Sequence, residues 1–141
     1  MSENTAPKGF SLWMMASRAY SFPASIIPVL FGSVLAVLLN PGLEFNFINF
    51  ILCLIGCILV QVGTNIINDI YDYEKGIDKE DKELGIPHGG SMVISMGLVS
   101  MKQMKTAAVV SLLIASLIGV YLYTVAGAWI IYLTLFGLLS A

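Results

Sequence analysis

Residues 45–78 read FNFINFILCLIGCILVQVGTNIINDIYDYEKGID, and this stretch decides the fold class. Its first half is apolar, whereas its second half carries amides and carboxylates. Because each residue of a helix advances by about 100°, five of these polar side chains share one stripe: Gln61, Asn65, Asn68, Asp69 and Asp72. An ionised side chain at membrane depth is costly unless it is paired or hydrated. The stretch therefore predicts a membrane-spanning helix with a functional polar end.

The composition supports a membrane protein. The 141 residues are 57% hydrophobic and 11% charged, whereas a soluble domain averages about 25% charged residues. Seven of the nine acidic residues lie between Asp69 and Glu83, and five of the seven basic residues lie between Lys75 and Lys105. The charge is concentrated in one loop and its flanking helix ends. No dense basic patch is present, so we expect no nucleic acid among the partners.

Outward from this stretch, the apolar segments predict an all-α, polytopic transmembrane bundle. Three segments are long enough to span a bilayer, namely residues 22–39, 45–73 and 106–125. A fourth begins near Trp129, and its roughly 13 residues cover only about 20 Å of a core about 30 Å thick. We therefore expect three full spans plus a truncated fourth, in an N-terminal fragment of a longer protein.

The segments before and between these spans also have expected roles. Residues 1–20 are a tail and interfacial segment, with a helix over residues 11–21, and residues 21–141 form the transmembrane domain. Basic residues favour the cytoplasmic side. They are absent from loop 40–46 and numerous in loop 75–105, so the N-terminus and the long loop should be cytoplasmic at the cell membrane. In that loop, Met92–Ser100 predicts a short amphipathic or re-entrant piece, and Ser100 can cap a helix that contains Gln103.

The polar stripe has the residue types of a cation site. Asn68 and Asp72 are four residues apart and lie on one helix face, and Asp69 adds a second carboxylate. Mg²⁺ prefers a few carboxylates together with water and substrate phosphate oxygens. Asp78, beyond Gly76, can fold back toward the same place. The pattern indicates a metal-bridged diphosphate, with a solvated helix rim as the simpler alternative.

The two polar residues nearer the apolar half of this helix have a different expected role. Gln61 and Thr64 are candidates for hydrogen bonds between helices.

Three stretches together resemble a known family. Asn68-Asp69-x-x-Asp72 followed by Lys75-Gly76-x-Asp78 resembles the first aspartate-rich motif of the UbiA prenyltransferase superfamily. The Gly76-Ile77-Asp78 ending is most similar to the branch with 1,4-dihydroxy-2-naphthoate prenyltransferases of menaquinone synthesis. Residues 18–29 resemble the opening helix of the family, and Gly89-Gly90-Ser91 resembles the loop between its second and third helices.

This resemblance implies an activity and a site. It implies transfer of an isoprenyl chain from a prenyl diphosphate to an aromatic acceptor, expected to be 1,4-dihydroxy-2-naphthoate, with Mg²⁺ as the cofactor. The implied metal ligands are Asn68, Asp72 and Asp78, the implied catalytic residues are Asp69 and Asp72, and the implied diphosphate contacts are Asn65, Lys75 and Ser91.

Two expectations qualify this assignment. The family's second aspartate-rich motif does not occur in the 141 residues, so we expect this chain to be inactive alone. A transport or channel subunit, in which the stripe lines a cation path, remains open as an alternative from another functional class.

Overall fold

The computed structural model describes residues 7–77 and 90–133, and the regular elements in them are all helical. A short helix α1 (Phe10–Ala16) and a 3₁₀ turn η1 (Ala19–Ser21) precede three long helices, which are α2 (Pro23–Leu39), α3 (Phe47–Lys75) and α5 (Met101–Ala126). The segment Ala19–Leu39, α3 and α5 are each long and apolar enough to cross a membrane. The predicted all-α class and its three spans are confirmed. Helix resumes at residues 129–133, and the rest of the predicted fourth segment lies outside the described residues.

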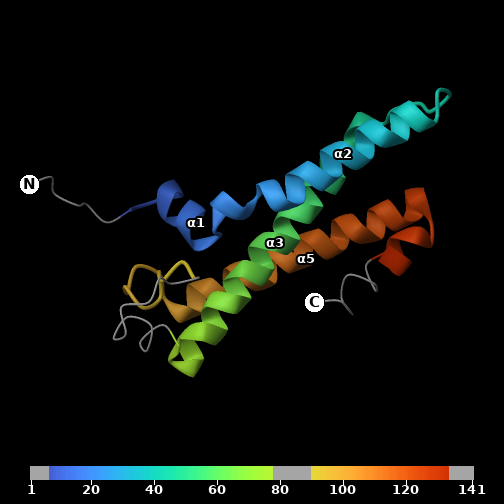
Figure 1. Ribbon diagram of the computed structural model, residues 1–141. Helices are drawn as coiled ribbons and strands as arrows, with labels where there is room; N and C mark the ends of the chain where they lie inside the picture. Colours follow the sequence, from blue (N-terminus) through green and yellow to red (C-terminus); the bar gives the residue numbers. More distant parts are fainter. Residues whose placement is uncertain (1–6, 78–89, 134–141) are drawn as a thin grey trace, which may run out of the picture.

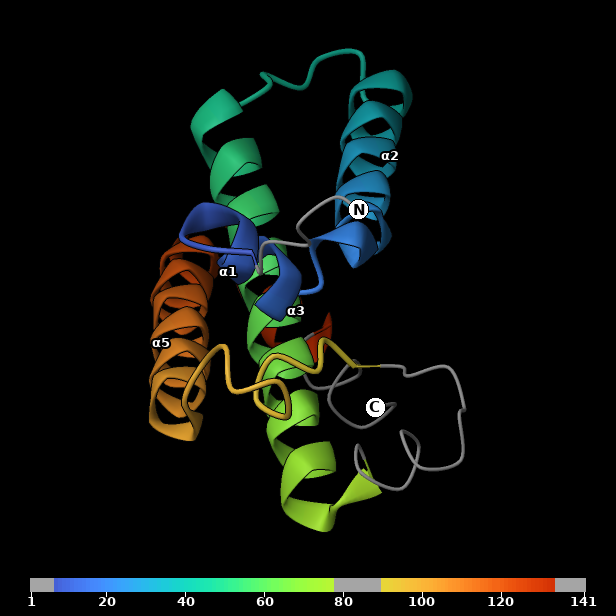
Figure 2. The ribbon, with the colours of Figure 1, turned by 90° about the vertical axis from the view of Figure 1, so that its left-hand side faces the viewer.

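Helix α3 is the centre of the arrangement, since it packs against both α2 and α5 (Figures 1 and 2). It runs antiparallel to α5. At one end the Tyr121 hydroxyl donates to Asn49 Oδ1 at 3.2 Å, and at the other end Lys105 donates to Glu74 at 2.7 Å. Between them, a Cβ added at Gly63 would lie 2.6 Å from Leu112. A small residue therefore permits this close approach, as is common between membrane helices.

Local signals explain where the long helices begin and end. The side chain of Asn46 accepts a hydrogen bond from the Asn49 backbone N–H at 3.0 Å and caps α3. Gly76 ends the same helix with φ 77°, a left-handed conformation that favours glycine. Ser100 and Gln103 form a capping box at the start of α5, which confirms the predicted cap. The apolar segment predicted from Thr106 is the main part of α5, and the helix begins at Met101, directly after the predicted cap.

The predicted interfacial helix over residues 11–21 is wrong in its extent. Helix α1 ends at Ala16, and Arg18 adopts a left-handed backbone with φ 52° and ψ 51°. This reversal bends the chain across α3 before α2 begins (Figure 2).

The buried core lies at the polar end of α3 and includes the segment that follows residue 90. That segment forms turns instead of a helix, and its apolar side chains join those of α1, α3 and α5. The buried cluster consists of Ala16, Ile66, Ile70, Val93, Ile94, Val99, Met104 and Ala108. Helix α2, in contrast, buries none of its residues within the described chain. The structure is therefore packed most firmly where the polar stripe lies.

Candidate functional site

The polar stripe of α3 is divided by its contacts, and its first part holds the N-terminal segment. The amide of Gln61 donates to the backbone oxygen and to the hydroxyl oxygen of Ser21, both at 2.8 Å, and its oxygen accepts from Ser25. The amide of Asn65 donates to Ser17 O at 3.0 Å and to Ser21 Oγ at 3.1 Å. Bonding between helical segments is thus confirmed for Gln61, and Asn65 takes part in the same network.

The interhelical prediction is wrong for Thr64. Its hydroxyl bonds the backbone oxygens of Val60 and Gln61, each at 3.0 Å, within its own helix. An exposed threonine can satisfy its hydroxyl on the preceding turn, so it needs no partner on another helix.

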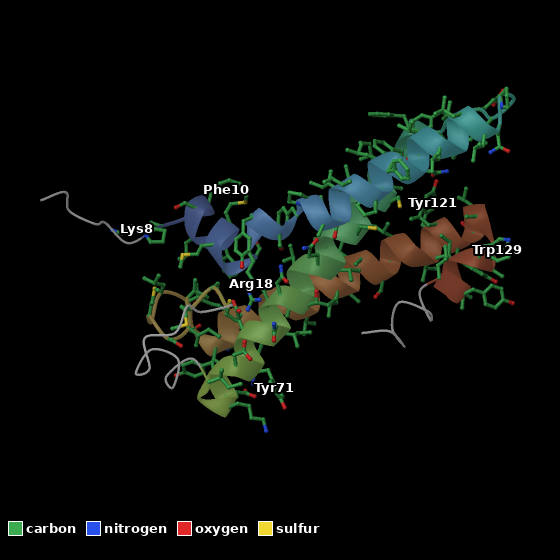
Figure 3. The ribbon with its side chains drawn as sticks, in the orientation of Figure 1. Lys8, Phe10, Arg18, Tyr71, Tyr121 and Trp129 are labelled. Atoms are coloured by element: carbon green, nitrogen blue, oxygen red, sulfur yellow. The ribbon has the colours of Figure 1, made fainter. Side chains whose placement is uncertain are left out.

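Asp69 forms the centre of a buried cluster. Its carboxylate pairs with the Arg18 guanidinium, accepts the Ser91 hydroxyl and accepts the Ser91 backbone N–H at 3.2 Å to each oxygen. Asp69 is 4% exposed, Ser91 5% and Arg18 9%. Figure 3 shows Arg18 where the N-terminal segment crosses α3. Two residues that the sequence assigned to chemistry, Asp69 and Ser91, therefore bind each other.

The absence of a side chain at Gly90 leaves space for this cluster. A Cβ at this position would lie 2.9 Å from Asp69 Oδ1 and 3.2 Å from Arg18 Nη2. The Gly90-Ser91 pair therefore combines a residue without a side chain with a residue that donates two hydrogen bonds.

Arg18 belongs to this cluster, although the sequence did not predict a role for it. A signal for it existed, because a carboxylate at membrane depth requires a cationic partner. Arg18 is the basic residue that directly precedes the first predicted span. The αL turn at this residue, which the sequence did not predict, directs its side chain to α3.

The remaining residues of the stripe are more exposed than Asp69. Asn68 is exposed and Asp72 is half-buried, about one helical turn farther along α3. The Lys75 ammonium lies 5.3 Å from the centroid of the Tyr71 ring. Asp78 lies outside the described residues. The structure therefore separates an accessible pair, Asn68 and Asp72, from the buried cluster around Asp69.

The accessible pair fits a hard cation by its donor chemistry. An amide oxygen and a carboxylate are ligands that Mg²⁺ accepts alongside water and phosphate oxygens. Within residues 7–77 and 90–133, no three His, Cys, Asp or Glu side chains gather closely enough to hold a metal ion. Any cation at Asn68 and Asp72 would therefore need further ligands from outside these described residues.

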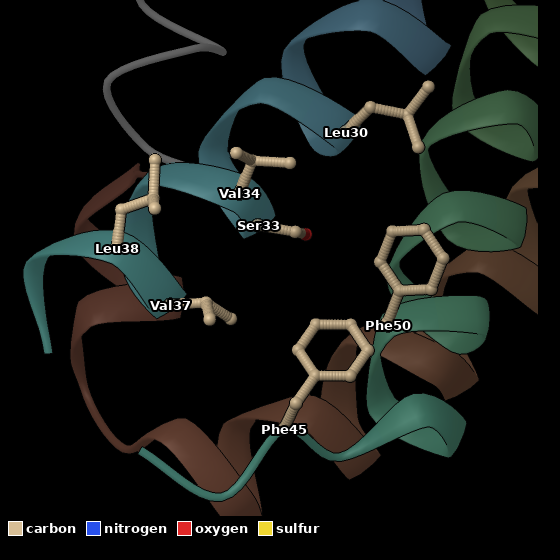
Figure 4. A pocket seen from close by; sticks show the side chains of 7 residues that line it. All are labelled: Leu30, Ser33, Val34, Val37, Leu38, Phe45 and Phe50. Atoms are coloured by element: carbon tan, nitrogen blue, oxygen red, sulfur yellow. The ribbon is translucent and has the colours of Figure 1, made fainter. Parts of the chain in front are cut away.

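An apolar hollow of about 400 Å³ lies between α2 and α3 at the opposite end of the molecule (Figure 4). Its single polar lining residue is Ser33, whose hydroxyl donates to Val29 O at 2.7 Å within the same helix. The other lining residues are Leu30, Val34, Val37, Leu38, Phe45 and Phe50. The hollow is separate from the polar site, which lies at the start of α2 and the end of α3.

Comparison with known proteins gives consistent matches. The model of the UbiA prenyltransferase family matches residues 25–141. The chain is 31% identical over 138 residues to a 1,4-dihydroxy-2-naphthoate octaprenyltransferase of Bacillus subtilis, covering 95% of this chain and 42% of that relative. A Haemophilus influenzae protein of the same name is 31% identical over 115 residues, covering 82% and 35%.

A third relative matches a shorter part of the chain. The UbiA prenyltransferase domain-containing protein 1 of Xenopus tropicalis is 33% identical over 78 residues, or 54% of this chain and 22% of the relative. No solved structure gives a significant match. The chain spans less than half the length of these curated relatives.

Proposed function

The chain belongs to the UbiA prenyltransferase family, and from this premise we propose that the whole protein transfers an isoprenyl group from a prenyl diphosphate to an aromatic acceptor. The family consists of transferases, which favours this activity over the transport hypothesis. The three helices that could span a bilayer suit a lipid-soluble prenyl chain. We further propose that the N-terminus and the polar end of α3 face the cytoplasm, as the distribution of basic residues indicates.

The acceptor that we propose is 1,4-dihydroxy-2-naphthoate. Two relatives whose names include this acceptor match most of the chain, each at 31% identity. The Gly76-Ile77-Asp78 ending of the aspartate motif supports the same branch.

The observation that supports the site is that Asn68 and Asp72 lie on one accessible face at the polar end of α3. We assign both as Mg²⁺ ligands, together with Asp78. Bound Mg²⁺ would offset the negative charge that develops on the departing diphosphate. We also assign Lys75, at the end of the same helix, as a positive charge that contacts the diphosphate.

The proposed reaction breaks the bond between the allylic carbon and the diphosphate oxygen, and the electron pair leaves with the diphosphate. The acceptor ring then forms a carbon–carbon bond to the allylic carbon. The ring carbon loses a proton or, at a carboxylated position, carbon dioxide. Departure of the diphosphate leaves an allylic cation, and apolar helix faces around the reacting carbon would keep water away from it.

The test uses membranes that contain the full-length protein, with Mg²⁺, a prenyl diphosphate and 1,4-dihydroxy-2-naphthoate. We expect Asp72→Asn to abolish product, because the amide removes a charge from the cation site. Glu74→Gln is the matched control, since Glu74 lies two residues away and pairs with Lys105 at the surface. Product formed at the unaltered rate by Asp72→Asn would refute the site. No product from the unaltered protein with any aromatic acceptor would refute the function.

A further inference from the structure

Three segments that are distant in sequence meet at the carboxylate of Asp69. Arg18 comes from the turn before the first span, Asp69 from α3, and Ser91 from the segment that leads to α5. Each of the three residues is at least nine-tenths buried. The proposed reaction assigns no role to this arrangement.

The carboxylate of Asp69 is already satisfied by donors. Its Oδ1 accepts from the guanidinium, its Oδ2 accepts from the serine hydroxyl, and both oxygens accept the Ser91 backbone N–H at 3.2 Å. A metal ligand must present a free lone pair to the cation. Asp69 could do so only by giving up donors in a buried place, where an unpaired charge is costly. It is therefore poorly placed as a ligand.

The arrangement also carries costs that a purely stabilising contact would avoid. Arg18 holds a left-handed backbone with φ 52°, and its buried Nε has no acceptor among the described residues. Gly90 must lack a side chain because of the two charged groups beside it. Strained backbone and unsatisfied buried groups are retained mainly where function requires a specific geometry.

We propose that Asp69 is a positioning residue, which with Arg18 and Ser91 fastens the N-terminal turn and the start of the segment after Gly90 onto α3, three residues from Asp72. This inference rests on the proposed function for the role of Asp72. The Arg18 charge offsets that of Asp69. The buried Val93, two residues beyond Ser91, holds the same segment from its apolar side.

The test compares Arg18→Gln, Asp69→Asn and the double variant in the full-length protein purified in detergent. Each single variant leaves one buried charge without its partner, so we expect the Tm to fall by on the order of 10 °C. The double variant pairs two amides and should recover most of this loss. If the single variants do not accumulate in membranes, the amount of the double variant in membranes replaces the Tm as the measurement, and we expect it to approach that of the unaltered protein. A double variant no more stable than the single ones would overturn the pairing.

Two activity measurements separate positioning from the other roles. Ser91→Ala, assayed well below its Tm, should lower the rate per folded molecule by about tenfold. Its Mg²⁺ concentration for half-maximal activity should be unchanged. An unchanged rate would mean that the cluster only stabilises the fold, and it would overturn the positioning role. If Asp69→Asn raises the Mg²⁺ concentration for half-maximal activity, Asp69 is a ligand and the inference fails.

The two kinds of measurement also distinguish this inference from the proposed function. The Tm comparison needs no substrate. Absence of prenyl transfer by the unaltered protein would therefore refute the function and the positioning role together, while the Arg18–Asp69 pairing would still be measured.

Discussion

One added methyl group at Gly63 tests how tightly α3 and α5 pack. An alanine Cβ would lie 2.6 Å from both Cγ and Cδ2 of Leu112, whereas carbon atoms in contact prefer about 3.5–4.0 Å. Overpacking of this kind costs about 1–3 kcal/mol, and the better helix propensity of alanine returns up to about 1 kcal/mol. Gly119→Ala in α5 is the matched control, because nothing lies within 4 Å of its added Cβ. The difference between the two variants therefore measures the overpacking cost.

Thermal unfolding of the purified protein in detergent, followed by far-ultraviolet circular dichroism, measures this difference. We expect the Tm of Gly63→Ala to lie about 5 °C or more below that of Gly119→Ala. A second change checks the cause, because Leu112→Ala in the Gly63→Ala background removes the crowding atoms. The double variant should lose less stability than the two single losses added together. A Gly63→Ala protein as stable as the Gly119→Ala protein would refute the close packing.

Two further predictions concern hydrogen bonds outside the charged cluster. Ser21→Ala removes the hydroxyl oxygen that accepts from Gln61 and Asn65, and we expect a loss of about 1 kcal/mol in unfolding free energy. The control is Ser116→Ala, whose hydroxyl donates to Leu112 O in its own helix, and equal Tm values for the two variants would contradict the prediction. Ser100→Ala removes the capping box of α5 and should cost about 1 kcal/mol. Hydrogen exchange should then accelerate in the first turn of α5, and unchanged exchange there would argue against the cap.

The long helices were predictable because their signals are local. The apolar run placed the end of α2 at Leu39, where the structure has it. The bounds of α3 were predicted within two residues at each end. The Ser100 cap predicted the start of α5, whereas the apolar segment begins only at Thr106, because Lys102 and Lys105 lower the hydropathy of the first residues of the helix.

The helical period grouped the polar residues of α3 on one stripe, but it could not distinguish their roles. Asn68 and Asp72 are proposed as ligands from residue type and spacing alone, because both criteria are properties of a single helix. The partner of Asp69, in contrast, lies 51 residues away along the chain. That pairing depends on the left-handed turn at Arg18 and on the space left by Gly90, both of which appear only when the segments pack together.

Local sequence therefore accounts for the spans and for the candidate ligands of the site, because hydrophobicity and helical spacing act over neighbouring residues. Tertiary structure decided which carboxylate is buried in an ion pair and which one is accessible. The physical reason is that the cost of burying a charge depends on the donors that surround it in space. At Asp69 those donors come from two other segments of the chain.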